Sequence, residues 1–237
     1  MRATVRSFQM FIRQIRSDSL LFLFCFLPFV VGAVFRFGIP FAEAQLCAVF
    51  HKPSILADYY LLFDLFMAVF SPYFLVFISA MVILTEVDER TAAYLAVTPI
   101  QRQGYLLSRL LYPALFSVLV SIALMLCCAL TPWTFPNILL VCLLAVVLCV
   151  PVAMLVVVFS HNRVEGMALA KLAGLILFGL PIPFFLKNGS QYLFSWLPSF
   201  WIGKVFPDLN AGAVVLALLV SFFWTWVMYR RFQRKLF

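Results

Sequence analysis

Charged residues are scarce in this sequence of 237 residues, since Asp, Glu, Lys and Arg make up only 11% of it. Soluble domains carry about 25%, and so few charges could not cover the surface of a soluble protein of this size. Hydrophobic residues make up 65% and include 28 phenylalanines. This composition also excludes a disordered chain, because disorder requires low hydrophobicity and high charge. The composition therefore indicates a protein that crosses a membrane several times.

Motifs for catalysis and metal binding are also lacking. The chain has nine glycines and no G-x-x-x-x-G-K-[ST] phosphate loop, so we do not expect it to hydrolyse ATP by itself. None of the six cysteines has C-x-x-C spacing, and five lie in apolar runs, where cysteine packs as a small hydrophobic residue. His51 and His161 have no second ligand at metal-binding spacing. We expect no catalytic residue, no metal site and no cofactor in this chain.

Six apolar stretches have the length of about 20 residues that a helix needs to cross the hydrocarbon core of a bilayer. No soluble domain fits between them. The sequence therefore predicts an all-α membrane protein in which residues 1–237 form a single transmembrane domain. The predicted spans are 19–39, 60–84, 106–130, 138–160, 167–186 and 211–229.

Residues 1–17 precede the first span and have two distinct faces at helical spacing. One face carries Arg6, Arg13 and Arg16, and the adjoining face carries Phe8 and Ile12. Such a helix lies in the plane of the membrane interface, with its arginines on anionic lipid headgroups. The alternative is an ordinary basic flank of the first span. We favour the interfacial helix, which makes membrane lipids a partner.

The basic residues are distributed unequally over the predicted connecting segments. A nucleic-acid-binding chain would cluster them on a soluble module, whereas here they lie at the ends of apolar runs, so we expect no nucleic acid partner. If both termini are cytoplasmic, thirteen of the 17 Lys and Arg residues lie on the inner side, as the positive-inside rule requires. The four outer ones are Arg36, Lys52, Lys187 and Lys204.

The densest polar segment, 85–104, follows the second span. Three acids and an arginine stand at a membrane edge where positive charge is the rule. Residues 91–97 can form a short helix that ends before proline, because the residue preceding proline avoids the α conformation. From composition alone, a solvated loop with a helix turn is the better explanation of the segment. The residues concerned are Glu86, Asp88, Glu89, Arg90, Thr98 and Pro99.

The run Glu86-x-x-Glu89-Arg90-Thr91, followed by Leu95-Ala96-Val97-Thr98-Pro99, resembles the first cytoplasmic loop of ABC-2 type exporter permeases. That family has an acidic run, a short leucine-rich helix and a Thr-Pro at this place. Residues 162–168 and 197–204 also resemble family segments, namely the polar entry to the fifth span and the outer segment before the sixth. The family has a glycine before the short helix, and here Arg90, Thr91 or Ala92 takes that place, depending on the alignment.

The resemblance implies a membrane permease subunit of an ATP-driven exporter in the bacterial cytoplasmic membrane. Its partners would be cytosolic ABC ATPase subunits, which bind ATP and Mg, and a second permease copy or paralogue. The segment 85–104 would be the coupling helix. Glu86, Asp88, Glu89 and Arg90 would be polar contacts to the ATPase, Tyr94 and Leu95 an apolar plug in its groove, and Thr98 and Pro99 the turn that follows.

Two further acids are candidates with two interpretations each. Asp64 lies about one turn inside the second span, where an acid is a candidate for the substrate pathway, although it could also pair with a neighbour such as Lys52. Glu165 stands beside Gly166 at the entry to the fifth span. It could cap that helix or contact the ATPase.

The segment 181–201 contains prolines and several aromatic residues, including Tyr192, Trp196 and Trp201. These indicate an aromatic belt at the membrane interface, and the family resemblance adds short re-entrant helices. The phenylalanine content suits an amphipathic or hydrophobic cargo such as a drug, peptide or lipid, but lipid-facing phenylalanine explains it equally well. A membrane scaffold or immunity subunit, or an ion-driven carrier, remains the alternative.

Overall fold

The computed structural model describes residues 2–91 and 101–236. All regular structure in these residues is helical, which confirms the predicted all-α class. In chain order the elements are α1 (Arg2–Ser17), α2 (Ser19–Ala33), η1 (Val34–Gly38), α3 (Ile39–Phe50), η2 (Ala57–Tyr59), α4 (Tyr60–Asp88), α6 (Gln101–Leu106), η3 (Leu107–Leu111), α7 (Tyr112–Cys128), α8 (Phe135–Phe159), α9 (Arg163–Ala173), η4 (Gly174–Gly179), α10 (Ile182–Phe185), η5 (Gly189–Phe194), α11 (Pro198–Asp208) and α12 (Ala211–Leu236).

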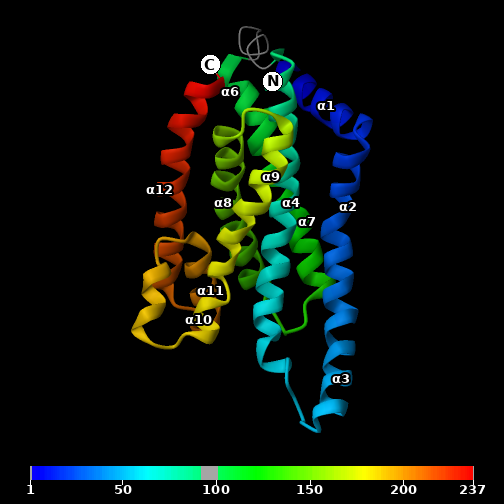
Figure 1. The fold of residues 1–237 in the computed structure, drawn as a ribbon, viewed down its shortest axis with the longest axis vertical. Coiled ribbons are helices and arrows are strands. Elements are labelled where there is room, and N and C mark those ends of the chain that lie inside the picture. The colour runs from blue at the N-terminus through cyan, green and yellow to red at the C-terminus, as the bar shows by residue number, and fades with distance from the viewer. Residues whose placement is uncertain (1, 92–100, 237) are drawn as a thin grey trace.

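Six helical stretches of the described chain are long and apolar enough to cross a membrane, as the sequence predicts. The central helices α4 and α8 are largely buried, whereas α2 and α12 lie at opposite sides of the bundle and expose most of their apolar surface (Figure 1). Both chain termini lie at one end, here called the termini end, and the opposite end is called the far end. The six stretches are Ser19–Phe50, Ala57–Asp88, Gly104–Cys128, Phe135–Phe159, Arg163–Phe185 and Ala211–Leu236.

The first membrane helix is longer than the predicted span 19–39, because Pro40 does not end it. The turns of η1 immediately before Pro40 are π-helical, and α3 continues to Phe50. Proline has no N–H to donate, and a widened π turn next to it lets the helix continue. The same arrangement occurs where η3 precedes Pro113.

The N-terminal helix α1 packs one face against the bundle and exposes the other. Ser7, Phe11 and Ile15, spaced by four residues, are buried against the bundle, whereas Arg6 and Arg13 are exposed. The chain turns from α1 into α2 at residue 18, whose carboxylate accepts the backbone N–H groups at the start of α2. This is an N-cap, and it fixes the corner between the two helices.

The short helices η5 and α11 lie between the stretch Arg163–Phe185 and α12, and α11 packs inside the protein. Gly179 and Gly203 permit this packing, because a Cβ on Gly203 would lie 2.3 Å from the carbonyl oxygen of Leu180. Trp196 is 57% exposed and fits the predicted aromatic belt, but Trp201 is only 9% exposed and donates to the carbonyl of Ser195. The belt interpretation is therefore wrong for Trp201, which belongs to the core.

Candidate functional site at the termini end

A buried ion pair joins the two helices that border the segment 85–104. Glu86 lies in the last turn of α4, Arg109 lies in η3, and each is 1% exposed. The guanidinium donates through Nε to both carboxylate oxygens at 3.0 and 3.1 Å and through Nη2 to Oε1 at 2.5 Å. The Tyr105 hydroxyl donates to Oε2 at 2.7 Å. The carboxylate is thus fully engaged, as a buried charge must be.

The same ion pair is bonded to the N-terminal helix. Arg109 Nη1 donates to the backbone carbonyl of Ser7 at 2.7 Å, and the hydroxyls of Ser7 and Ser108 lie 3.0 Å apart. The guanidinium carbon also lies 5.6 Å from the ring centre of Phe11, within the range of a cation–π contact. The residues Ser7, Glu86, Tyr105, Ser108 and Arg109 are called the Glu86 cluster. It fastens α1, α4 and η3 together.

A second set of contacts joins the α1–α2 corner, the end of α4 and the start of α9. Arg163 Nη1 lies 2.5 Å from Asp18 Oδ2, and the backbone N–H of Arg163 donates to Asp88 Oδ2 at 3.0 Å. The side chains of Asp18 and Arg163 are about one quarter exposed. Hydrogen bonding to Arg163 is the largest cause of the lowered pKa of Asp18, and the backbone N–H bonds at the start of α2 act in the same direction. Asp18, Asp88 and Arg163 are called the Arg163 cluster.

Glu165 has the contacts of a helix cap. The Asn162 side chain accepts the backbone N–H of Glu165 at 2.8 Å, and the Glu165 carboxylate accepts the backbone N–H of His161 at 2.7 Å. This reciprocal pattern is close to a capping box. Glu165 is also exposed, so both interpretations drawn from the sequence remain compatible with its position.

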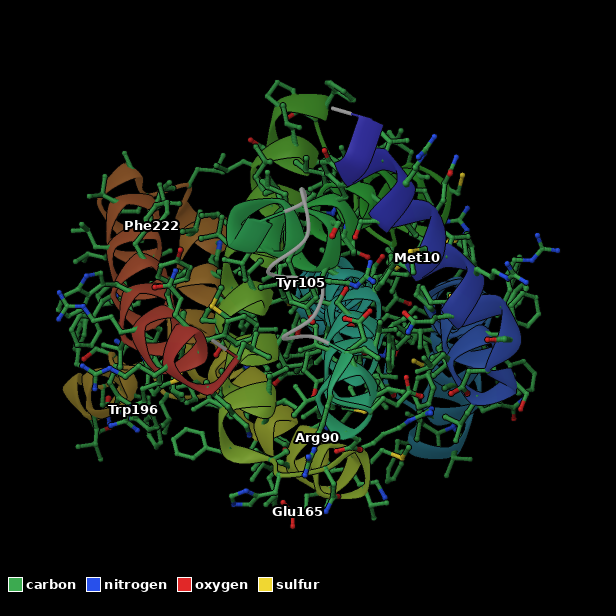
Figure 2. All side chains as sticks on the ribbon, turned by 90° about the horizontal axis from the view of Figure 1, so that it is seen from above. Met10, Arg90, Tyr105, Glu165, Trp196 and Phe222 are labelled. Carbon is green, nitrogen blue, oxygen red and sulfur yellow. The ribbon has the colours of Figure 1, made fainter. Side chains whose placement is uncertain are left out.

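The predicted ATPase contacts occupy different environments. Asp88, Glu89 and Arg90 are exposed, and the view onto the termini end shows Arg90 on the same side of the molecule as Glu165 (Figure 2). Glu86 is buried, and a direct contact with a partner does not fit that burial. The remaining predicted contacts, at Tyr94, Leu95, Thr98 and Pro99, lie outside the described residues.

Arg90 has the backbone conformation that glycine adopts most easily. It follows the end of α4 with a φ of 57°, in the left-handed region where an L-residue is strained. A residue in this conformation commonly ends a helix, and it is usually glycine. Three positions, Arg90, Thr91 and Ala92, could correspond to the glycine of ABC-2 permeases. Of the two that the structure describes, Arg90 has the left-handed φ.

A polar cavity of about 450 Å³ lies between the α1–α2 corner and the end of α4. Its lining includes the side chains of Gln14, Asp18, Thr85, Glu89 and Arg163. These residues carry both charges and several hydrogen-bonding groups, so the cavity can receive a polar or charged side chain of another protein.

Asp64 lies at the far end and is 1% exposed. Its carboxylate accepts the backbone N–H groups of Leu130 and Thr131 at 2.8 and 2.9 Å, the Thr131 hydroxyl at 2.6 Å and the Trp133 indole N–H at 2.9 Å. No bond to Lys52 is found among the described residues. The contacts of Asp64 thus hold the loop between α7 and α8 onto α4. Within the described chain, no three His, Cys, Asp or Glu side chains gather as a metal site.

Sequence reasoning missed the partners of Glu86. Arg109 counted only as one of the inner basic residues, although it falls within the predicted span 106–130, where an arginine requires a partner. Its position inside that span is the signal that could have identified the ion pair. Ser7 and Tyr105 carry no comparable signal.

Comparison with known proteins places the chain among export permeases. The family model described as "Fluoroquinolones export permease protein Rv2686c-like" matches residues 11–230. Two relatives from Mycobacterium tuberculosis strains, the fluoroquinolones export permease proteins MT2760 and Rv2686c, are each 27% identical over 170 residues, which cover 67% of this chain. The match spans 66% of the length of these relatives. No solved structure matches. The chain is an integral membrane protein of the Rv2686c-like export permease family, an ABC-2 type permease family.

Proposed function

We propose that this chain is the membrane subunit of an ATP-driven exporter in a bacterial cytoplasmic membrane, with its termini end in the cytoplasm. Separate ABC ATPase subunits supply the energy, and a second permease chain, a copy or a paralogue, completes the pathway. Family membership supports export, and the excess of basic residues on the inner segments supports the orientation. ATP and Mg belong to the partner subunits in this proposal.

The observation that carries the proposal is that the helices on either side of the segment 85–104 are bonded to other helices of the bundle. The Glu86 cluster holds α4 and η3 to α1, and the Arg163 cluster holds α4 to α9. Both clusters are at the termini end, where the ATPase would bind. A displacement of the segment by the ATPase would therefore move α4, α7, α9 and α1 together, because the ends of these helices are bonded to one another.

The residues near the segment then divide into two roles. Asp88, Glu89 and Arg90 are exposed and form polar contacts with the ATPase, and the polar cavity beside Glu89 receives a side chain of that partner. Tyr94 and Leu95 form the apolar plug, followed by the turn at Thr98 and Pro99. Glu86 acts through Arg109 as a positioning residue that transmits the movement.

The cargo we propose is a small amphipathic or hydrophobic molecule. The two Mycobacterium tuberculosis relatives are named for the export of fluoroquinolones, which are aromatic amphipathic compounds, so this class is the first to test. Asp64 is not part of the substrate pathway in this proposal, because its four hydrogen-bond donors come from a single loop of the chain.

The test reconstitutes the chain with an ABC ATPase from the same organism and measures ATP hydrolysis and drug transport in proteoliposomes. Substituting Tyr94→Asp and Leu95→Asp together should lower drug-stimulated ATP hydrolysis and transport at least tenfold. The matched control changes the same dipeptide in η5, Tyr192→Asp with Leu193→Asp, which lies away from the termini end (Figure 1). This control should retain binding of the ATPase subunit.

The outcomes also separate the alternatives. Unchanged coupling in the Tyr94 and Leu95 variant contradicts the assignment of the segment. A chain that binds the ATPase but never stimulates ATP hydrolysis is a scaffold or immunity subunit. Transport that follows an imposed ion gradient without ATP identifies an ion-driven carrier.

A further inference from the structure

An apolar cavity of about 310 Å³ lies between α1, α2, α4 and α7. This volume is within the range of about 300–1,000 Å³ that is usual for ligand sites. Phe8 and Phe11 of α1, Phe22 and Cys25 of α2, and Phe116 of α7 contribute to its lining. Arg16 is the one charged side chain among its described lining residues. The cavity therefore suits a long apolar group that ends near a negative charge.

The cavity opens toward the part of the surface that faces lipid. Three of its lining residues, Ile12, Phe22 and Phe116, are 42%, 47% and 54% exposed. Phe22 and Phe116 belong to the exposed apolar faces of α2 and α7, which in an integral membrane protein are in contact with acyl chains. An acyl chain can thus enter the cavity sideways from the bilayer.

The charge beside the cavity matches a phospholipid headgroup. Arg13 and Arg16 are exposed on α1, and neither takes part in the ion pairs found among the described residues. An amphipathic helix of this kind lies at the depth of the lipid phosphates, where each basic residue attracts anionic lipid. We propose that the cavity binds one acyl chain of an anionic phospholipid, whose phosphate lies on Arg16.

The lining favours a lipid chain over a soluble drug. Sites for drug-like ligands are mostly apolar and use a few precisely placed polar groups to orient the ligand. Here the described lining offers only the Arg16 guanidinium and the Cys25 thiol beyond aromatic, aliphatic and proline side chains. An acyl chain needs no hydrogen-bond partner along its length, and its headgroup needs only the arginine at the mouth.

The bound acyl chain would contact the residues that hold α1 in place. Phe8 and Phe11 line the cavity and stack on each other with ring centres 5.8 Å apart. Phe11 also contacts the Arg109 guanidinium of the Glu86 cluster. A lipid that binds only the folded protein stabilises it, and this one would do so by holding α1 against the bundle. The inference does not depend on transport.

The experiment counts lipids that stay bound to the purified full chain by native mass spectrometry, and then titrates delipidated protein with palmitoyl-oleoyl phosphatidylglycerol. Phosphatidylcholine with the same chains is the neutral comparison. Arg16→Gln should weaken phosphatidylglycerol binding about fivefold. Arg6→Gln removes the same charge about 15 Å away along α1 and should change binding less than twofold. Phosphatidylglycerol should also raise the unfolding temperature of the wild-type chain.

Filling the cavity tests the acyl-chain part. Cys25→Phe should remove the tightly bound lipid, whereas Cys127→Phe, the same substitution at an exposed position of α7, should retain it. If Cys25→Phe fails to fold, the comparison of phosphatidylglycerol binding between Arg16→Gln and Arg6→Gln decides whether the proposal stands. Equal effects of Arg16→Gln and Arg6→Gln, or equal binding of phosphatidylcholine, overturn the proposal. Displacement of the lipid by a fluoroquinolone, one for one, also overturns it and makes the cavity a drug site.

Discussion

The two ends of α4 each contain a buried carboxylate, and the two are satisfied in different ways. Asp64, near the far end, and Glu86, at the termini end, are both 1% exposed. Asp64 accepts bonds from neutral donors of residues 130, 131 and 133. Glu86 is paired with the positive charge of Arg109 and accepts a further bond from Tyr105. The two sites thus have the same burial but different charge balance.

The difference indicates what each site does. The partners of Asp64 lie in one loop, so the site holds that loop onto α4 and acts locally. The Glu86 cluster joins α1, α4 and η3, and Arg109 reaches Ser7 across 102 residues of sequence. A change at Glu86 therefore affects the relative position of several helices, whereas a change at Asp64 affects one connection. This contrast can be tested by mutation at both ends.

The largest effect is expected when Arg109 is removed. Arg109→Ala leaves Glu86 buried without its cation, and breaking a buried pair in this way costs about 3–5 kcal/mol of unfolding free energy. Denaturant unfolding of the chain in detergent measures it. The double variant Glu86→Leu with Arg109→Leu removes both charges and should recover at least half of the loss. A loss below about 1 kcal/mol in Arg109→Ala would show that the pair is not essential to the fold.

Asp64→Asn should have a smaller effect, of about 2 kcal/mol. The amide keeps one acceptor oxygen but turns an NH₂ group toward N–H and O–H donors, which leaves buried donors unsatisfied. The same unfolding measurement applies, together with drug transport normalised to folded protein. Transport per folded molecule should stay unchanged, because the donors around Asp64 belong to the protein itself. A loss of transport in folded Asp64→Asn would restore the hypothesis that Asp64 lies in the substrate pathway.

The partly exposed pair between Asp18 and Arg163 extends the comparison to a solvated site. Asn is as good an N-cap as Asp, so Asp18→Asn removes the charge while it keeps the cap of α2. Exposed ion pairs contribute about 0.2–1 kcal/mol, and this loss is expected at pH 7. High salt should make the difference in unfolding free energy between wild type and Asp18→Asn smaller still, because it screens the ion pair.

The pH dependence of this pair has a defined sign. Arg163 lowers the pKa of Asp18 in the folded protein below the ordinary value of about 3.9. The stabilising contribution is therefore complete above that value and is lost as the pH falls through the lower folded pKa. Unfolding temperatures of wild type and Asp18→Asn should converge below about pH 4. A difference that persists unchanged at lower pH would contradict the ionic origin.

The fold class could be predicted because apolar runs of sufficient length determine membrane helices without knowledge of their partners. The end of the first helix could not be predicted, because proline breaks helices in most contexts. The π turn before Pro40 lets the helix continue, and no residue type in the sequence signals such a turn. Capping of α9 by Glu165 depends on local spacing, which is why the sequence offers it as one of two interpretations, whereas the part of Asn162 in the cap was not predicted.

The candidate site could be predicted only in part, because its exposed residues follow from local composition whereas its buried pairing does not. Local composition shows that Asp88, Glu89 and Arg90 belong to a polar run, and these three residues are exposed. Glu86 belongs to the same run but faces inward on α4, toward an arginine 23 residues away. Pairings of this kind depend on how helices pack, and the residue spacing in one sequence contains no record of them. The same holds for the bond between Asp18 and Arg163.

The smallest effect is expected for two glycine substitutions, one at each end of the molecule, that distinguish backbone strain from contact with the ATPase. Arg90 at the termini end and His51 after α3 both have left-handed φ values, 57° and 51°. Glycine removes the strain of about 1–2 kcal/mol but loses about 0.5–1 kcal/mol through its freer unfolded chain. Arg90→Gly and His51→Gly should therefore each stabilise the chain by about 0.5 kcal/mol in denaturant unfolding. Only Arg90→Gly should also weaken co-purification of the ATPase subunit, because Arg90 is a proposed contact and His51 is not. Equal retention of the ATPase by both variants would remove Arg90 from the docking surface and leave it a helix-ending residue alone.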